Sequence, residues 1–511
     1  MQPTSFPSVK EYPGAVRKRL SFSPQRVADY AILVGLALYA MAAPHSIAGA
    51  EAGLTLVALG WLLRTLATGK TGLRRTAVDL PLWLFFAWSI ASALLSAEPR
   101  ISLLKLQTVS TFLVFYFAQA TLTRARVVAL AALLIASGVT GALWSVSEIV
   151  RGRGLIVESV AADSPFRETS PAPLEPGECV WRVNKDRVAS VAEIDEVIRR
   201  LPAGKPLTVS VIAFGENLEW TGPPVTDELK ERANPSGLTG AQHAHRFRAS
   251  GWTRHYEMFA ETLQMIAQLA LGLALANLQK KGLRRRVALF AAAFVLLAVG
   301  IALTAMRTVL IAFAIGATVV VWRATDRQRR SIRLGVLAVI ASALIFGALV
   351  VARTRASGAL LLQDASSSLR WRVARAAIER IPLHPLFGHG MDAVKRHWTE
   401  WNFPGTIMIH THSTPVQIAF DRGLPAVLFW LSLMVAFWLM ATRAEKAWRA
   451  SDDTDGYGFL LGALGALAGF LASSIVNYNF GNSEVALLFW WLMGAVVAVQ
   501  GDIVNYKKRR D

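Results

Sequence analysis

The chain has 511 residues, of which 53% are hydrophobic and only 17% are charged, and its mean hydropathy is +0.39. This composition excludes an ordinary soluble enzyme. It predicts a polytopic α-helical membrane protein, because each membrane-crossing helix needs roughly 20 mostly apolar residues. The 54 Lys and Arg outnumber the 35 Asp and Glu, but the cations gather in short clusters between apolar runs, which indicates membrane topology and not nucleic-acid binding. The single cysteine, Cys179, excludes an intramolecular disulfide and a CxxC site.

Twelve apolar runs have the length of a membrane span. They cover residues 27–45, 49–67, 79–97, 103–121, 126–149, 256–279, 286–304, 307–324, 333–351, 422–441, 457–476 and 484–501. Basic clusters precede the first run and follow every second run, so the positive-inside rule predicts that both termini are cytoplasmic. We therefore expect an all-α polytopic protein of about twelve transmembrane helices, without a cleaved signal peptide.

The connections between these runs divide the chain. We expect a cytoplasmic tail over 1–26, five helices over 27–149, an outer domain with its linker over 150–240, four helices over 241–351, an outer loop over 352–421, and three helices with a basic tail over 422–511. The two long connections lie on the same, non-cytoplasmic face. Function is expected there, because long loops in compact proteins usually carry it.

The first long connection has the pattern of a small α+β domain. A strand begins at Gly154, a second covers 180–183, an amphipathic helix covers 191–201 and a third strand covers 207–212. Together with Pro176-Gly177 and the turn at 184–186, the run over about 150–222 is similar to a PDZ domain of the bacterial protease-associated kind. The resemblance implies a protein partner bound by strand addition at a sheet edge. A plain spacer or docking module is the alternative.

The second long connection ends in the segment with the strongest chemical signal. It reads Ile-His410-Thr-His412-Ser413, and Gly423 follows at the start of the next apolar run. Upstream lies an amphipathic helix that carries Arg370, followed by a Pro- and Gly-containing turn at 384–390.

Together these segments resemble the O-antigen ligase and O-antigen polymerase family of bacterial membrane glycosyltransferases. Arg248 with Gly251, and Arg307 at the entry of the eighth run, occupy two further segments of the family pattern, so that the resemblance covers about 246–440. The chain departs from the pattern at Met306, where Ser is usual, and at Ser413, where Asn is common.

Glycan transfer from a lipid pyrophosphate needs a base for the acceptor hydroxyl and cations for the leaving group. A positioned histidine is typically worth about 10²- to 10⁴-fold in rate, and arginine binds phosphate oxygens with two hydrogen bonds. We therefore predict His412 as the base, with Arg307 and Arg248 as catalytic cations. The residues expected to bind substrate are Arg370, His410, Ser413 and Gly423.

The resemblance implies an inverting, metal-independent glycosyltransferase without a cofactor. Its donor would be an undecaprenyl-pyrophosphate-linked glycan and its acceptor a sugar hydroxyl of the lipid A core. The active site would face the periplasm from the bacterial inner membrane, among membrane lipids. An O-antigen or exopolysaccharide polymerase with the same donor, or an enzyme with a protein acceptor, would use the same residues and is not excluded.

Other interpretations of these residues stay open. His412 can be an interfacial residue that binds a carbonyl, and two His-x-His pairs, at 243–245 and 410–412, can be metal ligands. Glu257 and Glu261 can simply balance nearby arginines. A transporter or another membrane protein with a PDZ docking module is the alternative from a different class. An intramembrane metalloprotease is excluded, since the sequence contains no HExxH.

Overall fold

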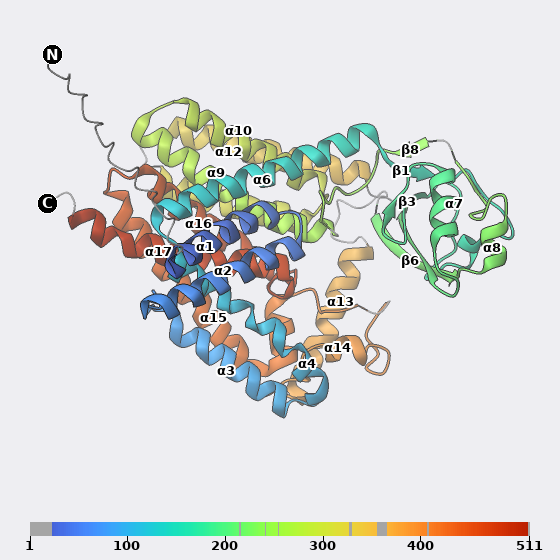
Figure 1. Ribbon diagram of the computed structural model, residues 1–511, viewed down its shortest axis with the longest axis horizontal. Coiled ribbons are helices and arrows are strands. Elements are labelled where there is room, and N and C mark those ends of the chain that lie inside the picture. The colour runs from blue at the N-terminus through green and yellow to red at the C-terminus, as the bar shows by residue number, and fades with distance from the viewer. Residues whose placement is uncertain are drawn as a thin grey trace, which may run out of the picture.

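The structure, a computed structural model, describes residues 23–213, 216–240, 242–253, 255–325, 330–354, 365–405 and 408–508. A helix bundle makes up most of the molecule, and a smaller domain lies beyond one end of it (Figure 1). The bundle helices are α1 (Pro24–Ala42), α2 (Ile47–Thr68), α3 (Asp79–Leu95), α4 (Pro99–Val109), α5 (Leu113–Thr121), α6 (Arg124–Arg151), α9 (Tyr256–Lys281), α10 (Arg285–Leu303), α11 (Arg307–Ala324), α12 (Arg330–Thr354), α15 (Thr414–Arg449), α16 (Thr454–Ser474) and α17 (Ser483–Lys508).

Every predicted span contains helix. Among the described residues, ten helical segments are long and apolar enough to cross a membrane, and one of them runs from Pro99 to Thr121 through α4 and α5. The two predicted spans outside this set are α1 and the 17-residue α3. The chain is thus a polytopic membrane protein, while the number twelve stays a prediction.

Three helices form the centre of the bundle. The most apolar windows of α9, α16 and α17 are 94%, 89% and 83% buried inside the protein. Close approach of α9 and α16 depends on glycine, because a Cβ on Gly272 would lie 2.3 Å from the carbonyl oxygen of Gly458. This packing fixes the first turn of α9 next to the ends of its neighbours.

The inserted domain, residues 153–244, follows α6 directly. Its strands are β1 (Arg153–Ile156), β2 (Ser159–Val160), β3 (Cys179–Val183), β4 (Asp186–Arg187), β5 (Pro206–Ala213), β6 (Glu216–Pro224), β7 (Leu238–Thr239) and β8 (Gln242–Ala244). The main sheet is antiparallel in the order β6-β5-β3-β1-β8. Helices α7 (Val191–Arg200) and α8 (Asp227–Glu231) complete the domain. The predicted strands and helix are confirmed, whereas the PDZ resemblance stays a prediction.

One face of this sheet packs on α7. Val209 and Val211 of β5 contact Ile194 and Ile198 of α7 in one buried cluster. Figure 1 shows α7 on the side of the sheet away from the bundle. The opposite sheet face is therefore the one turned toward the helices.

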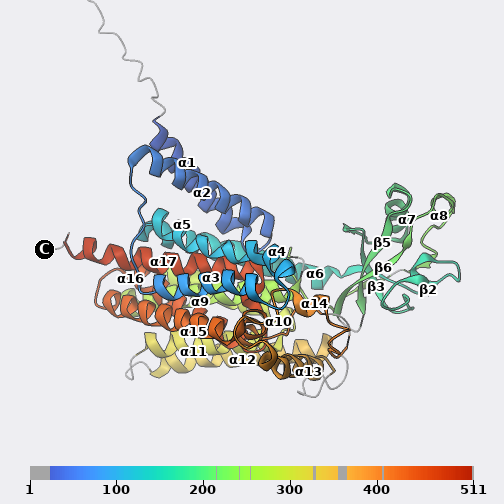
Figure 2. The same ribbon diagram turned by 90° about the horizontal axis from the view of Figure 1, so that it is seen from below.

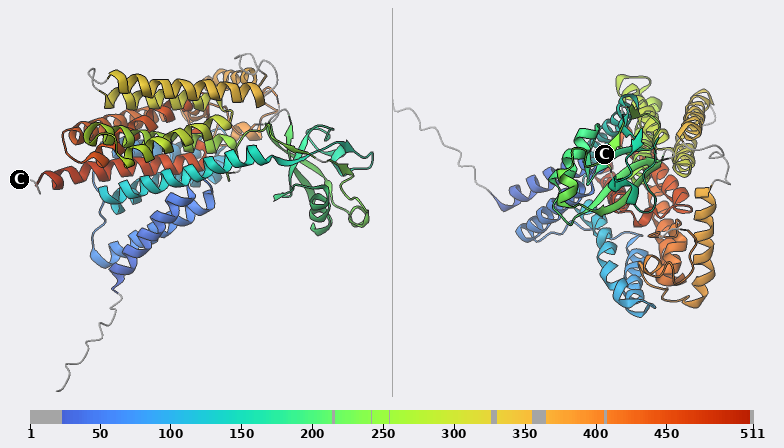
Figure 3. Two further views of the ribbon diagram at one scale, coloured as in Figure 1. Left: turned by 90° about the horizontal axis from the view of Figure 1, so that it is seen from above. Right: turned by 90° about the vertical axis from the view of Figure 1, so that its right-hand side faces the viewer.

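The second long connection contains α13 (Ala365–Arg380), the 3₁₀ turn η4 (Ile381–Leu383) and α14 (Ala393–Arg396). Helix α15 begins at Thr414, earlier than the predicted 422, because Gln417, Asp421 and Arg422 are buried against protein and not against lipid. The inserted domain and α13 lie at the same end of the bundle, and α1 begins and α17 ends at the other end (Figures 2 and 3).

Candidate active site

Five segments meet at the end of the bundle that carries the inserted domain. They are the first turns of α9, α11 and α15, helix α13, and the connection 475–482 between α16 and α17. Asn477 of this connection is 0% exposed and holds the segments together.

Each polar group of Asn477 binds a different segment. Its amide nitrogen donates to Glu261 Oε1 of α9 at 3.2 Å and to Thr308 Oγ1 of α11 at 3.1 Å. Its amide oxygen accepts from Arg370 of α13 at 3.2 Å, and its backbone carbonyl accepts from the Thr414 hydroxyl of α15 at 3.0 Å. One buried asparagine thus positions an arginine, a carboxylate and two helix N-termini.

His410 and His412 lie beside Asn477 and its partners, which we call the Asn477 hub. The centres of the two imidazole rings are 4.5 Å apart, and the rings meet edge to face. The backbone N–H of His412 donates to His410 Nδ1 at 3.2 Å, and His412 Nε2 is 3.0 Å from the sulfur of Met408. His412 has a φ of +56°, which is unusual for a residue other than glycine. Its buried Nδ1 has no hydrogen-bond partner in the part of the chain that the structure describes.

The surroundings keep both rings neutral. Burial, then His410, then Arg370 lower the pKa of His412 to about 2. Burial and Arg370 also lower the pKa of His410, and the nearby Glu257 carboxylate opposes them. These charge effects indicate that Arg370, Glu257 and the two histidines lie near one another.

Arg307 and Arg248 lie on the α10–α11 side of this neighbourhood. Arg307 is the first residue of α11, half-buried, and precedes Thr308, which binds Asn477. Arg248 is only 1% exposed: its guanidinium lies 4.0 Å from the ring centre of Tyr256 and donates to the carbonyl of Ala305 at 3.3 Å. A guanidinium packed in this way supports the turn before Arg307.

Two carboxylates occupy the first two turns of α9. Glu261 accepts from the hydroxyl of Ser473 at 2.7 Å as well as from Asn477. Glu257 is buried one turn nearer the surface, and its Oε1 has no hydrogen-bond partner within the described ranges. Glu261 therefore belongs to the framework, while the Glu257 carboxylate is near enough to His410 to act on its pKa.

Gly423 permits a crossing of two backbone segments. It breaks α15 with a φ of +80°, and a Cβ there would lie 1.9 Å from the carbonyl oxygen of Leu386. The backbone N–H of Leu424 donates to the carbonyl of Pro385 at 2.8 Å. This close approach accounts for the glycine without a substrate. Ser413, the N-cap residue of α15, is buried next to the hub.

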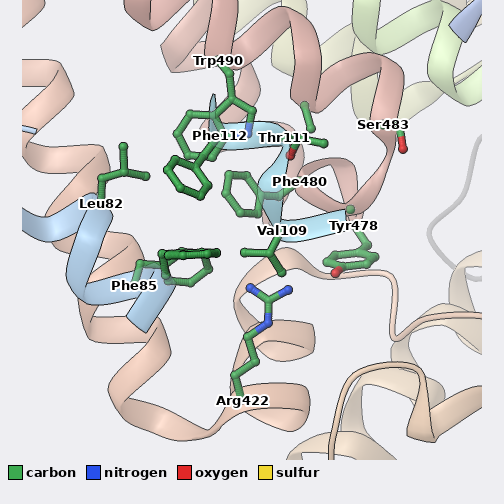
Figure 4. A pocket seen from close by; sticks show the side chains of 13 residues that line it. Leu82, Phe85, Val109, Thr111, Phe112, Arg422, Tyr478, Phe480, Ser483 and Trp490 are labelled. Carbon is green, nitrogen blue, oxygen red and sulfur yellow. The ribbon is translucent and has the colours of Figure 1, made fainter. Parts of the chain in front are cut away.

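A small cavity lies beside the site, under α3 and the 475–482 connection. Figure 4 shows the side chain of Arg422 pointing toward it from α15, with Phe85 and Tyr478 on either side and the rings of Phe112, Phe480 and Trp490 farther away. Its volume of about 60 Å³ gives room for a few waters and not for a sugar. Arg422 also lies 3.4 Å from the hydroxyl of Ser89. This arginine therefore helps to hold α15 on α3.

Metal ligands do not gather in the described part of the chain, where no three His, Cys, Asp or Glu side chains are arranged to hold an ion. The second His-x-His pair lies apart from the hub: His243 binds the carbonyl of Gly154, and His245 binds that of Ile149 at 3.0 Å. Arg375 pairs with Glu379 at 2.8 Å on the exposed face of α13.

The chain was compared with known protein families and with curated protein sequences. Residues 292–431 match the family model described as O-antigen ligase. The match includes Arg307, Arg370 and the His410–Ser413 segment, and excludes Arg248, Asn477 and the inserted domain. No curated protein sequence matches the chain. The match and the ten apolar helices support a membrane-bound, glycosyltransferase-like enzyme of O-antigen or lipopolysaccharide assembly.

Proposed function

We propose that this protein is an O-antigen ligase-like glycosyltransferase of the bacterial inner membrane. It moves a glycan from undecaprenyl pyrophosphate to a sugar hydroxyl of the lipid A core, at the periplasmic face. The observation that carries the proposal is the buried Nδ1 of His412, which has no hydrogen-bond partner among the described residues and lies in the electrostatic neighbourhood of Arg370.

His412 would act as the general base. The acceptor oxygen attacks the anomeric carbon of the donor sugar while its proton passes to Nδ1 of His412. The bond between the anomeric carbon and the phosphate oxygen breaks, and undecaprenyl pyrophosphate leaves with the bonding electron pair. Attack opposite to the leaving group inverts the anomeric centre.

The low pKa of His412 fits a base that becomes stronger when the donor binds. Arg370 is one of the groups that lower this pKa. A pyrophosphate bound to Arg370 would offset that positive charge, and a nearby anion favours the protonated imidazole. The pKa of His412 would then rise toward the range in which general bases are effective.

Arg370 and Arg307 would bind the pyrophosphate oxygens. Arg370 is held by Asn477, and Arg307 begins the helix whose Thr308 binds the same asparagine. Cations fixed in advance where charge develops usually contribute strongly to the rate. Arg248 would act as a positioning residue behind Arg307, and His410 and Ser413 would line the acceptor side.

The proposed orientation rests on charge. The clusters at 284–286 and 443–449, and the end of α17 at Lys508, lie at the ends of the bundle helices away from the inserted domain. The positive-inside rule assigns that end to the cytoplasm. The site then faces the periplasm, where lipid-linked glycans and lipid A core would meet.

The test is a gel of surface lipopolysaccharide from cells that carry His412→Ala, with His245→Ala as a control and protein levels matched. Ligase activity predicts core bands alone for His412→Ala, with long glycan left on the lipid carrier, and a normal ladder for the control. Core with a single repeat would indicate the polymerase instead. An unchanged ladder for His412→Ala would overturn the proposal.

A further inference from the structure

A large cavity lies between the inserted domain and the start of α9. Its volume is about 900 Å³, toward the upper end of the roughly 300–1,000 Å³ that small-molecule sites occupy. Strands β3, β5 and β6 line one wall, and His255, Tyr256 and Met258 line the other.

The wall on the inserted domain is a polar sheet face. Ser210 pairs with Arg182 on one side and with Glu219 on the other, so the three side chains form a row across β3, β5 and β6. Thr208 and Asn217 lie on the same face, because residues two apart along a strand point the same way. Val209 and Val211 point to the α7 side.

This cavity lies next to the proposed active site. Asn217 donates to the backbone carbonyl of Arg248 at 3.0 Å, which joins the sheet to the segment that enters α9. Tyr256, in the opposite wall, lies under the Arg248 guanidinium, and His255 is close enough to His410 to lower its pKa. Two residues of the cavity wall, Tyr256 and His255, thus lie next to residues of the proposed site.

The lining has a positive charge balance. Among the described residues that line it are three cations, Arg182, Lys185 and Lys205, and one carboxylate, that of Glu219. The Arg182 guanidinium stacks 4.0 Å from the ring centre of Trp181, which holds it in place. Burial, then Arg187 and Arg153, lower the pKa of Arg182 to about 10. An anion at this position would relieve the repulsion between these arginines.

We propose that this cavity binds an anionic saccharide of the transfer reaction, with its phosphate or carboxylate groups on Arg182, Lys185 and Lys205 and its hydroxyls on Thr208, Ser210 and Asn217. The inserted domain is thereby a wall of the substrate site and not only a docking module. This inference rests on the proposed function, because the bound saccharide is taken to be part of the donor glycan or of the acceptor of that reaction.

The test measures binding of two soluble probes to the full-length protein in lipid nanodiscs. The probes are tetragalacturonate, which is anionic, and maltotetraose, a neutral glycan of the same length. The cavity variant is Arg182→Gln/Lys185→Gln/Lys205→Gln. The matched control is Arg199→Gln/Arg200→Gln/Arg232→Gln, which removes the same charge from exposed positions on and near α7, on the other side of the sheet.

We expect the unmutated protein and the control to bind tetragalacturonate in preference to maltotetraose. The cavity variant should lose affinity by about tenfold or more, a change of about 1.4 kcal/mol. Equal binding of both probes, no binding by the unmutated protein, or an equal loss in the control variant would overturn the inference.

The source of the saccharide is determined by competition for the probe. Displacement by lipopolysaccharide that lacks O-chains assigns the cavity to the acceptor, and displacement by undecaprenyl-linked glycan assigns it to the donor. Displacement by neither would overturn the link to this reaction. Because probe binding needs no turnover, His412→Ala should bind normally. Failure of the proposed function, seen as an unchanged lipopolysaccharide ladder, is therefore distinguishable from failure of this inference.

Discussion

At His412, burial, His410 and Arg370 all act on the ring in the same direction, so the folded protein holds it neutral. The unfolded chain takes up a proton below about pH 6.5, whereas the folded ring does not. Below pH 6.5 the free energy of unfolding therefore decreases as the pH falls, by about 1.4 kcal/mol per pH unit for this histidine. Above pH 6.5 this loss is absent.

We predict that His412→Gln reduces the acid sensitivity of the fold. The melting temperature of the purified protein should fall between pH 7.5 and pH 5.5, and it should fall less for His412→Gln than for the unmutated protein. His389 and His410, whose pKa values burial also lowers, leave part of the fall in place. Thermal unfolding in detergent at the two pH values measures this, and identical falls would contradict the burial argument.

A second residue-scale prediction concerns Asn477. Replacing it with alanine leaves Glu261, Thr308 and Arg370 without a shared partner, and each buried polar group left unsatisfied costs about 1–3 kcal/mol. We expect a lower melting temperature and, because Arg370 loses its support, transfer reduced by about 10²-fold. Ser432→Ala is the control, since its exposed hydroxyl binds the carbonyl of Leu428 in its own helix. Normal glycan transfer by Asn477→Ala would contradict the claim that Asn477 positions Arg370 for the reaction.

The sequence could indicate the chemistry of the site but not its framework. His412, His410 and Arg370 lie near one another in the structure, and all three belong to one connection, while their roles stay predictions. Asn477 had no comparable signal, and the sequence indicated Glu261 only as a carboxylate that can balance nearby arginines. Their importance comes from hydrogen bonds between helices that are far apart in the chain, and only the cluster of Ser and Asn over 473–483 hinted at it.

Among the elements, α15 shows where hydropathy misplaces a boundary. Its first turns carry buried polar residues with protein partners, such as Gln417, which donates to Asp421 at 2.8 Å. A hydropathy pattern assumes that membrane-depth side chains meet lipid, so it begins the span only after them. Gly423, predicted to bind substrate, lies where the α15 backbone crosses the 385–390 segment.

We predict that Gly423→Ala disrupts this crossing. Its Cβ would lie 1.9 Å from the carbonyl oxygen of Leu386 at a φ that disfavours side chains, so less folded protein and a lower melting temperature should result. Gly335→Ala in α12 is the matched control, because a Cβ at that position would meet no other side chain or neighbouring helix within 4 Å. Size-exclusion profiles and thermal unfolding check the pair. Equal size-exclusion profiles and melting temperatures for the two variants would contradict the claim that the backbone crossing requires glycine at position 423.

In the molecule as a whole, alternation of basic clusters predicted which connections share a face, and the inserted domain and α13 do lie at one end. Which helices are central could not be predicted. The runs that become α9 and α16 differ from the others chiefly in small residues such as Gly272 and Gly458, whose effect depends on the partner helix. The place of the inserted domain over the site likewise depends on contacts such as that of Asn217 with Arg248.

The orientation predicts the reactivity of engineered cysteines. The native Cys179 is buried, and burial raises the pKa of its thiol to about 12, so it should give little background labelling. A membrane-impermeant maleimide applied to spheroplasts should label Arg200→Cys on the inserted domain and spare Ser451→Cys between α15 and α16. After permeabilisation both should react. The reverse pattern would contradict a periplasmic site.

The central claim is that His412 removes the acceptor proton in a glycan transfer. The most direct measurement is transfer of labelled glycan from undecaprenyl pyrophosphate to core lipopolysaccharide by the purified, reconstituted protein. We predict that His412→Ala lowers the rate by about 10²- to 10⁴-fold while tetragalacturonate binding and the melting temperature at pH 7.5 stay near normal, and that His245→Ala is unaffected. A His412→Ala protein that transfers glycan at the unmutated rate would contradict the account.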